Sequence, residues 1–222
     1  MRSFLTIEKE CTHETIVKKS RFICSLKPIC ELKEGIIFLK EVKKKYADAT
    51  HNCYSILGLP ESNEEKTSDD GEPAGTGGLP IKNILVQNEL RGIACIVTRY
   101  FGGIKLGASG LSSAYANSVV ESLARVSVVE MIWSEIFDVI LSYSEAIEAT
   151  NRLQKEKIVC LGSQYFEKVK VKFGIPSEKK DVFYRIMEDI TSGKVNMEIC
   201  SKQYLGYRRE INESDFIKKS QK

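Results

Sequence analysis

Carboxylates, cations and a histidine–cysteine pair gather around two glycine-rich segments in the first half of this 222-residue chain. Nine of its fifteen glycines lie between Gly71 and Gly110. Glycine permits positive φ angles and a close approach of the backbone to another group. We therefore interpret residues 69–78 and 102–110 as two shaped loops. The first has acids at its start, and the second lies between an apolar run and a helical pattern.

The second loop has the sequence context of an anion site. It follows the apolar run at residues 93–100 and precedes a helical pattern, where backbone N–H groups and the helix dipole hold phosphate. Arg99 and Lys105 supply two cations. Tyr100 and Phe101 place two aromatic rings beside Arg99, of which alternation leaves at most one exposed for base stacking. The predicted anion- or RNA-binding residues are Arg99, Tyr100, Gly102, Gly103, Lys105, Gly107, Ser109 and Gly110. The alternative is a tight turn in which Ser109 caps the next helix.

Three carboxylates stand at the start of the first loop, at Asp69, Asp70 and Glu72. One interpretation is a magnesium site that helps to grip phosphate, since hard cations prefer carboxylate oxygens. We favour a carboxylate-rich turn, because hard-metal sites usually gather their acids from separate segments. In such a turn the acids accept N–H bonds from glycines such as Gly75, or pair with Arg99. These four loop residues are predicted to shape the loop, and no metal or cofactor is predicted.

His51 and Cys53 are two residues apart, hence on one face if a strand begins at Asn52. Such a pair forms a nucleophilic dyad only if the thiolate is activated and the imidazole is oriented. His13 is the only other histidine, so a zinc site built on histidines is not expected. We favour a packed thiol beside a hydrogen-bonded imidazole, with the dyad as the alternative.

The bulk composition is that of an ordinary soluble globular protein. The net charge of +3 is shared by both halves, so bulk charge does not argue for nucleic acid, although a local basic face stays open. The seven cysteines include no CxxC motif and mostly fall in apolar segments, which indicates reduced thiols in a cytoplasmic protein. We expect neither a signal peptide nor a membrane span. Ala108 replaces the lysine of a P-loop, which argues against a Walker NTPase.

Hydrophobic periodicity predicts two units, residues 1–132 and 133–222. In the first, we expect strands at 4–11, 21–29, 52–59 and 93–100, and helices at 31–46, from Pro80 and at 111–126. The link around His13 and the charged segment 61–70 are predicted as loops. In the second, we expect strands at 136–143, 158–166, 168–173 and 195–204, and helices at 145–156 and 178–190. This βαββαβ order is typical of a ferredoxin-like domain. A polar, frayed tail is expected from residue 210.

Two sequence runs carry a family resemblance. DDGEPAGTGGLP at residues 69–80, followed by VTRYFGGIKLGASGL at residues 97–111, resembles the signature of the YigZ/IMPACT family. KKSRFI at residues 18–23 and the spacing of His51 and Cys53 also match the family pattern. The match covers most of the first unit. The second unit resembles the smaller C-terminal domain of the bacterial-type members in its element order.

The resemblance implies an α+β protein. Its first domain is expected to have a ribosomal-protein-like α/β fold, a four-stranded sheet with helices on one face, and its second domain a ferredoxin-like fold. This tandem resembles the last two domains of elongation factor G, which face RNA on the ribosome. Eukaryotic relatives regulate translation through an extra N-terminal domain that this sequence does not show, so their partner is not carried over.

We therefore expect a translation-associated regulatory protein that binds RNA or a ribosome-associated partner through its glycine-rich surface. Two alternatives stay open. One is a hydrolase of the metal-assisted or Cys/His type that acts on a small molecule. The other is a protein-binding scaffold whose loops fit a partner's surface. The sequence leaves the oligomeric state open.

Overall fold

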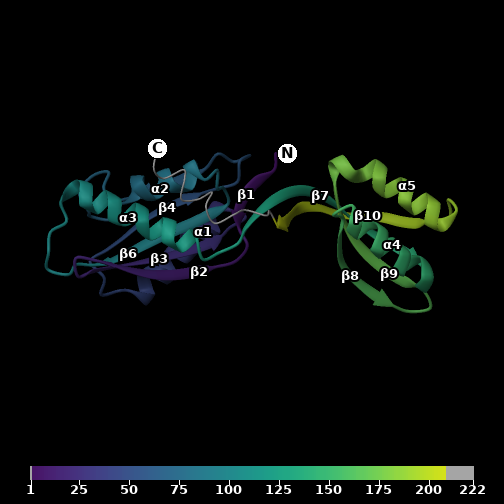
Figure 1. Ribbon diagram of the computed structural model, residues 1–222, viewed down its shortest axis with the longest axis horizontal. Coiled ribbons are helices and arrows are strands. Elements are labelled where there is room, and N and C mark those ends of the chain that lie inside the picture. The colour runs from purple at the N-terminus through teal and green to yellow at the C-terminus, as the bar shows by residue number, and fades with distance from the viewer. Residues whose placement is uncertain (1, 209–222) are drawn as a thin grey trace. The chain divides into compact units, whose positions relative to one another are not determined.

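The computed structural model describes residues 2–208, which fold into two compact units (Figure 1). Phe4–Glu130 form the first unit, and Met131–Gly206 form the second together with the start of the chain. The boundary predicted from the sequence lies between residues 132 and 133. No helix within residues 2–208 is long and apolar enough to cross a membrane. The tail predicted from residue 210 lies outside the described residues.

A five-stranded antiparallel sheet forms the centre of the first unit, in the order β2-β3-β6-β4-β5. Its strands are β2 (Cys11–Val17), β3 (Ser20–Pro28), β4 (His51–Leu57), β5 (Glu65–Ser68) and β6 (Ile93–Tyr100). The central strand β6 has the bounds that the apolar run predicted, and nearly all of it is buried. In the register of β4 with β6, His51 lies opposite Arg99 and Cys53 opposite Val97. A short strand, β1 (Phe4–Ile7), precedes the sheet.

Helices cover both faces of this sheet. Helix α1 (Leu32–Lys45) packs on one face, whereas α2 (Gly78–Gln87) and α3 (Gly107–Leu123) pack on the other. The predicted four-stranded sheet with helices on one face was therefore wrong in two respects. Strand β5 adds a fifth strand, and α1 covers the second face. The reason is visible in β6, where residues of both alternations are apolar, so both faces of the strand must be shielded from water.

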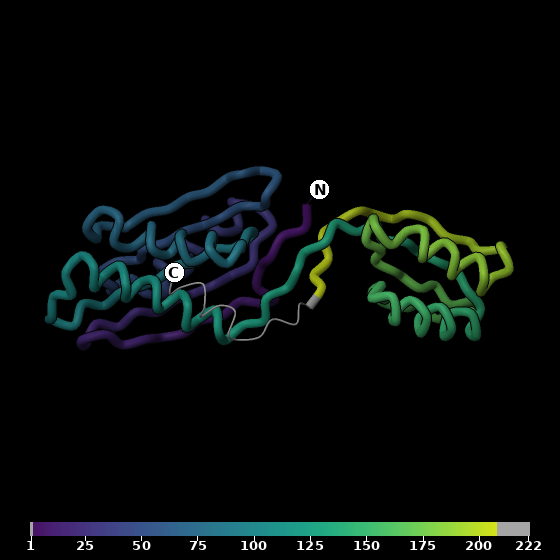
Figure 2. Tube along the Cα trace, turned by 45° about the horizontal axis from the view of Figure 1, so that its top comes forward, coloured from purple at the N-terminus to yellow at the C-terminus, as the bar shows by residue number. Residues whose placement is uncertain are grey.

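The second unit has the predicted βαββαβ order of elements (Figures 1 and 2). Its elements are β7 (Val128–Leu141), α4 (Tyr143–Lys155), β8 (Val159–Tyr165), β9 (Val169–Pro176), a 3-10 turn η1 (Ser177–Lys179), α5 (Lys180–Thr191) and β10 (Asn196–Arg208). Strand β7 pairs with β9 and β10, and β9 pairs with β8. Side chains of β7, β9, α4 and α5 form one apolar core, which includes Phe137, Phe173 and Phe183.

Three of the differences between the predicted and the observed elements have a clear physical cause. His13 lies inside β2, because an edge strand with alternate residues exposed looks like a polar link. The segment 61–70 contains β5, whose sequence EKTS has no apolar residue to reveal it. Strand β7 begins at Val128, so Trp133, where we expected the second unit to begin, lies within it.

Candidate functional site

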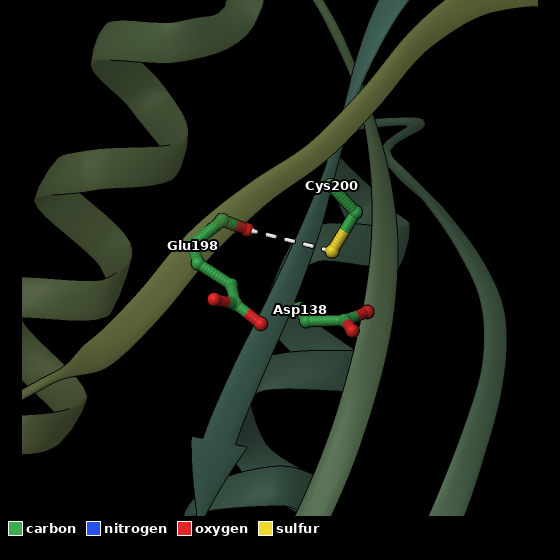
Figure 3. A group of neighbouring side chains, drawn as sticks. All are labelled: Asp138, Glu198 and Cys200. Atoms are coloured by element: carbon green, nitrogen blue, oxygen red, sulfur yellow. Dashed lines mark hydrogen bonds between the residues drawn. The ribbon is translucent and has the colours of Figure 1, made fainter.

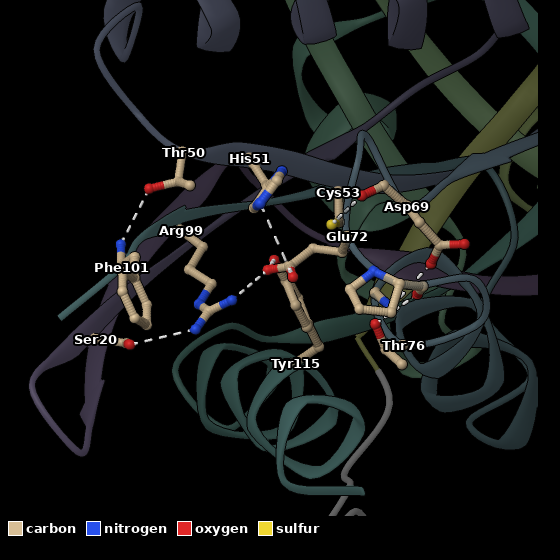
Figure 4. A network of polar contacts seen from close by, with 12 residues as sticks. Ser20, Thr50, His51, Cys53, Asp69, Glu72, Thr76, Arg99, Phe101 and Tyr115 are labelled. Atoms are coloured by element: carbon tan, nitrogen blue, oxygen red, sulfur yellow. Dashed lines mark hydrogen bonds and ion pairs between the residues drawn. The ribbon is translucent and has the colours of Figure 1, made fainter. Parts of the chain in front are cut away.

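A buried carboxylate, that of Glu72, joins the first glycine loop to the sheet and to α3 (Figure 4). Its Oε1 accepts hydrogen bonds from Arg99 Nη1 at 2.6 Å and from the Tyr115 hydroxyl at 2.8 Å. Its Oε2 lies 3.9 Å from His51 Nε2. Glu72 is only 8% exposed and Arg99 only 5%. The stability of each buried charge depends on the other, because removal of either partner leaves the remaining charge buried and unpaired.

Arg99 therefore lies inside the first unit and does not face an external anion. Besides its bond to Glu72, its Nη2 donates to Ser20 Oγ at 3.4 Å. Its guanidinium also lies 5.5 Å from the ring centroids of Phe22 and of Phe101. The prediction that Arg99 is a phosphate-binding cation was therefore wrong, because its guanidinium is buried and paired with Glu72. The alternative, in which the acids of the first loop pair with Arg99, is what the structure shows.

Asp69 occupies the N-terminus of α2. Its Oδ1 accepts the amides of Gly77 at 2.9 Å and Gly78 at 2.8 Å, and its Oδ2 accepts the amide of Gly75 at 2.9 Å. Burial acts to raise the pKa of Asp69, but these three donors outweigh it and hold the pKa below its ordinary value. At Gly78 a Cβ would lie 2.7 Å from the carbonyl oxygen of Ser68, so only glycine fits there. These bonds agree with the loop-shaping role predicted for Asp69 and Gly75.

Asp70 points to a different set of partners. Its Oδ1 accepts from Lys43 Nζ at 2.6 Å, and its Oδ2 accepts from the amide of Asn52 at 2.7 Å. The carboxylates of Asp69, Asp70 and Glu72 do not converge within metal-ligand distance of one another in the described chain. Each acid already has its own donors, which favours the predicted carboxylate-rich turn over the magnesium alternative.

His51 and Cys53 each bind the backbone of the first loop. His51 Nδ1 lies 2.9 Å from the carbonyl oxygen of Asp70, and Cys53 Sγ donates to the carbonyl oxygen of Asp69 at 2.9 Å. Burial raises the pKa of the Cys53 thiol to about 12, even though a contact with Tyr115 acts to lower it. A thiol that stays protonated at neutral pH is not a nucleophile. These contacts favour the packed thiol beside a hydrogen-bonded imidazole over the dyad.

The second glycine loop leads from β6 into α3 without an internal acid. The amide of Gly102 donates to Ser20 Oγ at 3.1 Å. Gly103 and Gly107 have φ angles of 82° and 73°, and at either position a Cβ would meet no atom within 4 Å. Helix α3 begins with no side-chain cap and no acidic residue in its first turn. The predicted cap at Ser109 is wrong, because the helix starts at Gly107 and Ser109 is already its third residue.

Three exposed lysines surround this second loop. Lys105 lies within it, and Lys18 and Lys19 form the turn between β2 and β3. The turn and the loop touch, since a Cβ on Gly102 would lie 2.0 Å from the carbonyl carbon of Lys19. None of the three lysines forms an ion pair with another residue of the range 2–208. Sequence reasoning missed Lys18 and Lys19, although both belong to the KKSRFI motif that it quoted.

The two aromatic residues after Arg99 have different environments. The Tyr100 hydroxyl donates to Asp48 at 2.7 Å, and the Tyr100 ring lies under the Arg21 guanidinium at 5.1 Å. The Phe101 side chain is 47% exposed beside the loop. Of the two rings considered for stacking, the exposed one is therefore that of Phe101, whereas the predicted RNA-binding residues included Tyr100 and not Phe101.

A second cluster, in the C-terminal unit, contains Asp138, Glu198 and Cys200 (Figure 3). Their ligand atoms lie within 4.8 Å of one another. However, Asp138 already forms ion pairs of 2.6 Å with Lys170 and with Lys172. Burial opposes the ionisation of Asp138, but bonds from both lysines outweigh it and lower its pKa to about 2. Two ammonium groups thus supply the positive charge that a metal ion would bring, and we assign no metal to this cluster.

Comparison with known proteins identifies the class to which this site belongs. Residues 18–123, which contain both glycine loops and the three lysines, match the Impact N-terminal domain. The chain is 34% identical to IMPACT family member YvyE of Bacillus subtilis over 92% of this chain and 94% of that protein. It is 30% identical to IMPACT family member YigZ of Escherichia coli over 89% of this chain and 98% of that protein.

The chain therefore belongs to the IMPACT family, as its two signature runs predicted. The likeness extends through both units. A crystal structure of a hypothetical protein, 27% identical, covers 90% of this chain and 98% of its own with a TM-score of 0.59. The α+β class with two sheets is thus supported by sequence and by structure.

Proposed function

We propose that this protein binds RNA through its phosphates at the open N-terminus of α3. The proposed surface, which we term the α3 cradle, consists of Lys18, Lys19, Phe101, Gly103, Lys105 and Gly107. The observation that carries the proposal is an uncapped helix start at the end of a loop that contains the exposed, unpaired Lys105 and touches the turn of two further exposed, unpaired lysines. Free N–H groups and the positive end of the helix dipole favour an anion, and lysines add affinity for a phosphate backbone.

The cradle also has features that suit a single-stranded ligand. The exposed Phe101 ring lies next to the loop, where a base could stack while its phosphate meets the amides. Gly103 and Gly107 leave the backbone uncovered, so a phosphate oxygen could approach the N–H groups closely. Arg99 supports this surface from beneath: Ser20 Oγ bonds to both Arg99 Nη2 and the Gly102 amide.

The family and the second unit support a role in translation. We infer that the βαββαβ unit is a ferredoxin-like domain and that the two units act together near ribosomal RNA, by analogy with the tandem of elongation factor G. An analogy of fold alone does not define a function. The proposal of RNA binding therefore depends on the α3 cradle, and the similarity to the elongation factor tandem indicates only that the RNA would be ribosomal.

The test is the salt dependence of binding to a labelled single-stranded RNA, measured by fluorescence anisotropy. The variant Lys18→Ala/Lys19→Ala/Lys105→Ala should bind more weakly. Its log–log slope against salt should fall in magnitude by about 2, at roughly 0.7 for each phosphate that the variant no longer neutralises. The control is Lys33→Ala/Lys40→Ala/Lys44→Ala on α1, which removes the same charge from exposed residues of another helix.

Two results would contradict the proposal. One is a wild-type protein that shows no RNA binding at low salt. The other is equal weakening by the two triple variants, because affinity would then follow total charge and not the cradle. Co-purification with ribosomes that survives nuclease treatment and is unchanged by the cradle variant would indicate a protein partner instead.

A further inference from the structure

Strand β8 is an exposed edge of the C-terminal sheet. Among the described strands it pairs only with β9 (Figure 1). Six of its seven residues are exposed. Its sequence, VCLGSQY, contains no charged residue and no proline. Folded proteins usually protect such an edge with charges or proline, since its free N–H and C=O groups invite another strand. An edge without these devices indicates that a partner strand covers it.

The unprotected part of β8 is its second half. A register shift between Cys160 and Gly162 marks a bulge, a feature that twists an edge away from pairing. From Gly162 to Tyr165 the pairing with β9 is regular, from Gly162↔Lys172 to Tyr165↔Val169. This half therefore keeps the straight backbone that another strand needs.

An apolar patch adjoins this half of the strand. Tyr143, Ile147, Tyr165 and Phe166 are 52%, 65%, 68% and 68% exposed. Tyr143 and Ile147 lie one helical turn apart on α4, so they share a face. The rings of Tyr143 and Tyr165 have centroids 6.2 Å apart, and the Tyr143 hydroxyl donates to the carbonyl oxygen of Phe166 at 2.8 Å. The four side chains thus form one patch, of the kind that marks protein–protein contacts.

We propose that a second copy of this chain covers this surface, with β8 of one copy pairing antiparallel to β8 of the other about a two-fold axis. In such an interface the same patch is used twice, so it must be complementary to itself. An uncharged strand meets this condition, because no like charges face each other across the axis. A charged peptide would need opposite charges on β8, and β8 has none.

The pairing explains both observations at once. The two sheets join into one continuous sheet, and the free backbone groups of Gly162–Tyr165 find partners. Helix α4 packs beside β8 in each copy, so the two α4 helices also approach each other across the axis. Tyr143 and Ile147 then bury their exposed faces against their counterparts.

The experiment measures molar mass by light scattering during size-exclusion chromatography. The wild-type protein should have twice the 25.0 kDa mass of one chain. Ser163 lies in the regular half of β8, so its two copies meet near the axis. Ser163→Lys and Ser163→Glu should each be monomeric, because like charges then oppose each other. An equimolar mixture of the two should recover the dimer, which a merely misfolded variant cannot do.

The control is Ile16→Lys, a charge placed on β2, the exposed edge of the other sheet, where Ile16 is 69% exposed. It should leave the dimer intact. A wild-type protein that is monomeric at every concentration would overturn the proposal, as would dimers that persist in both Ser163 variants. If both variants fail to fold, hydrogen exchange of the wild-type β8 amides decides. Protection that rises with protein concentration supports the interface, and protection independent of concentration rejects it.

Discussion

The two glycine loops of the first unit have similar compositions and opposite environments. In the first loop, the start of α2 is filled by the chain itself, since Asp69 accepts the amides of Gly75, Gly77 and Gly78. In the second loop, the start of α3 has no cap and no acid, and Lys105 lies in the loop beside it. One helix start is thus satisfied internally, and the other faces outward.

From this difference we infer that the sign of the neighbouring charge decides whether a glycine loop is closed by its own chain or stays open to a ligand. Glycines bare the amides in both loops, which prepares each for an anion. Where a carboxylate of the same chain is within reach, it takes the position and the loop becomes part of the fold. Where cations gather instead, the amides keep their capacity for a ligand.

The largest effect is expected from Arg99→Ala, which disrupts the anchor of the first loop. It leaves the Glu72 carboxylate buried without its charged partner. The free energy of unfolding in urea should fall by about 3–5 kcal/mol. The double variant Glu72→Leu/Arg99→Met, which removes both charges, should lose less than the single variant. A loss below about 1 kcal/mol for the single variant, the value of a surface pair, would contradict the buried-pair interpretation.

The next effect compares the two helix starts directly. Asp69→Ala removes the acceptor of three amides and should lower the free energy of unfolding by about 2 kcal/mol, the upper end for a helix cap. Ser109→Ala at the start of α3 should change it by less than about 0.5 kcal/mol, because Ser109 caps nothing. Equal losses for the two variants would remove the distinction between the loops.

A smaller effect is the pH dependence that Asp69 confers. Its pKa is lower in the folded protein than its ordinary value of 3.8, so its contribution to stability is fully present above that value. The contribution is lost as the pH falls through the folded pKa. The difference in unfolding free energy between wild type and Asp69→Asn should therefore be constant near neutral pH and shrink in acid. Other acids with lowered pKa values occur in both proteins and cancel. A difference that grows in acid would reverse the assigned sign.

The smallest effect is expected when an acid is introduced at the start of α3, like the one that Asp69 provides at the start of α2. Ser109→Asp places a carboxylate in the first turn of α3 and should stabilise the protein by about 0.3–1 kcal/mol. It should also weaken RNA binding, because the new carboxylate occupies the amides and repels phosphate. The control is Ser113→Asp, the same charge on an exposed position one turn further along α3. Similar RNA binding by both variants would locate the ligand elsewhere.

The sequence predicted the elements that have a strong apolar period. The bounds of β6 were predicted correctly, and the inner stripe of α3, Leu111, Tyr115, Val119 and Leu123, is buried as expected. The edge strands β2 and β5 were missed or shortened because exposed alternate residues carry little hydrophobic signal. Edge strands are defined by the neighbour to which they bond, and that neighbour is not adjacent in the sequence.

The site was predicted in part for a related reason. The two glycine-rich motifs contain Glu72 and Arg99, the ion pair of the buried polar network, and the pairing of the loop acids with Arg99 is one of the interpretations that the sequence supports. Whether Arg99 faces inward depends on Glu72, 27 positions earlier, and on the packing of α3 over both. The role proposed for Lys18 and Lys19 depends on a turn that touches Gly102 only in the folded sheet. Charge in a sequence does not reveal which cations will find a buried partner.

Ser20 has a consequence beyond its own packing. Its side chain is fully buried, and its hydroxyl contacts both the guanidinium of Arg99 and the backbone at the start of the second loop. Movement of the exposed second loop is thereby coupled to the buried ion pair of Arg99 and Glu72. A ligand that displaces the loop outward would also displace the Arg99–Glu72 ion pair. Its binding would therefore change the hydrogen-exchange protection of residues buried in the first unit. The same contact limits the length of the loop, because an insertion would break the hydrogen bond between the Gly102 amide and the Ser20 hydroxyl.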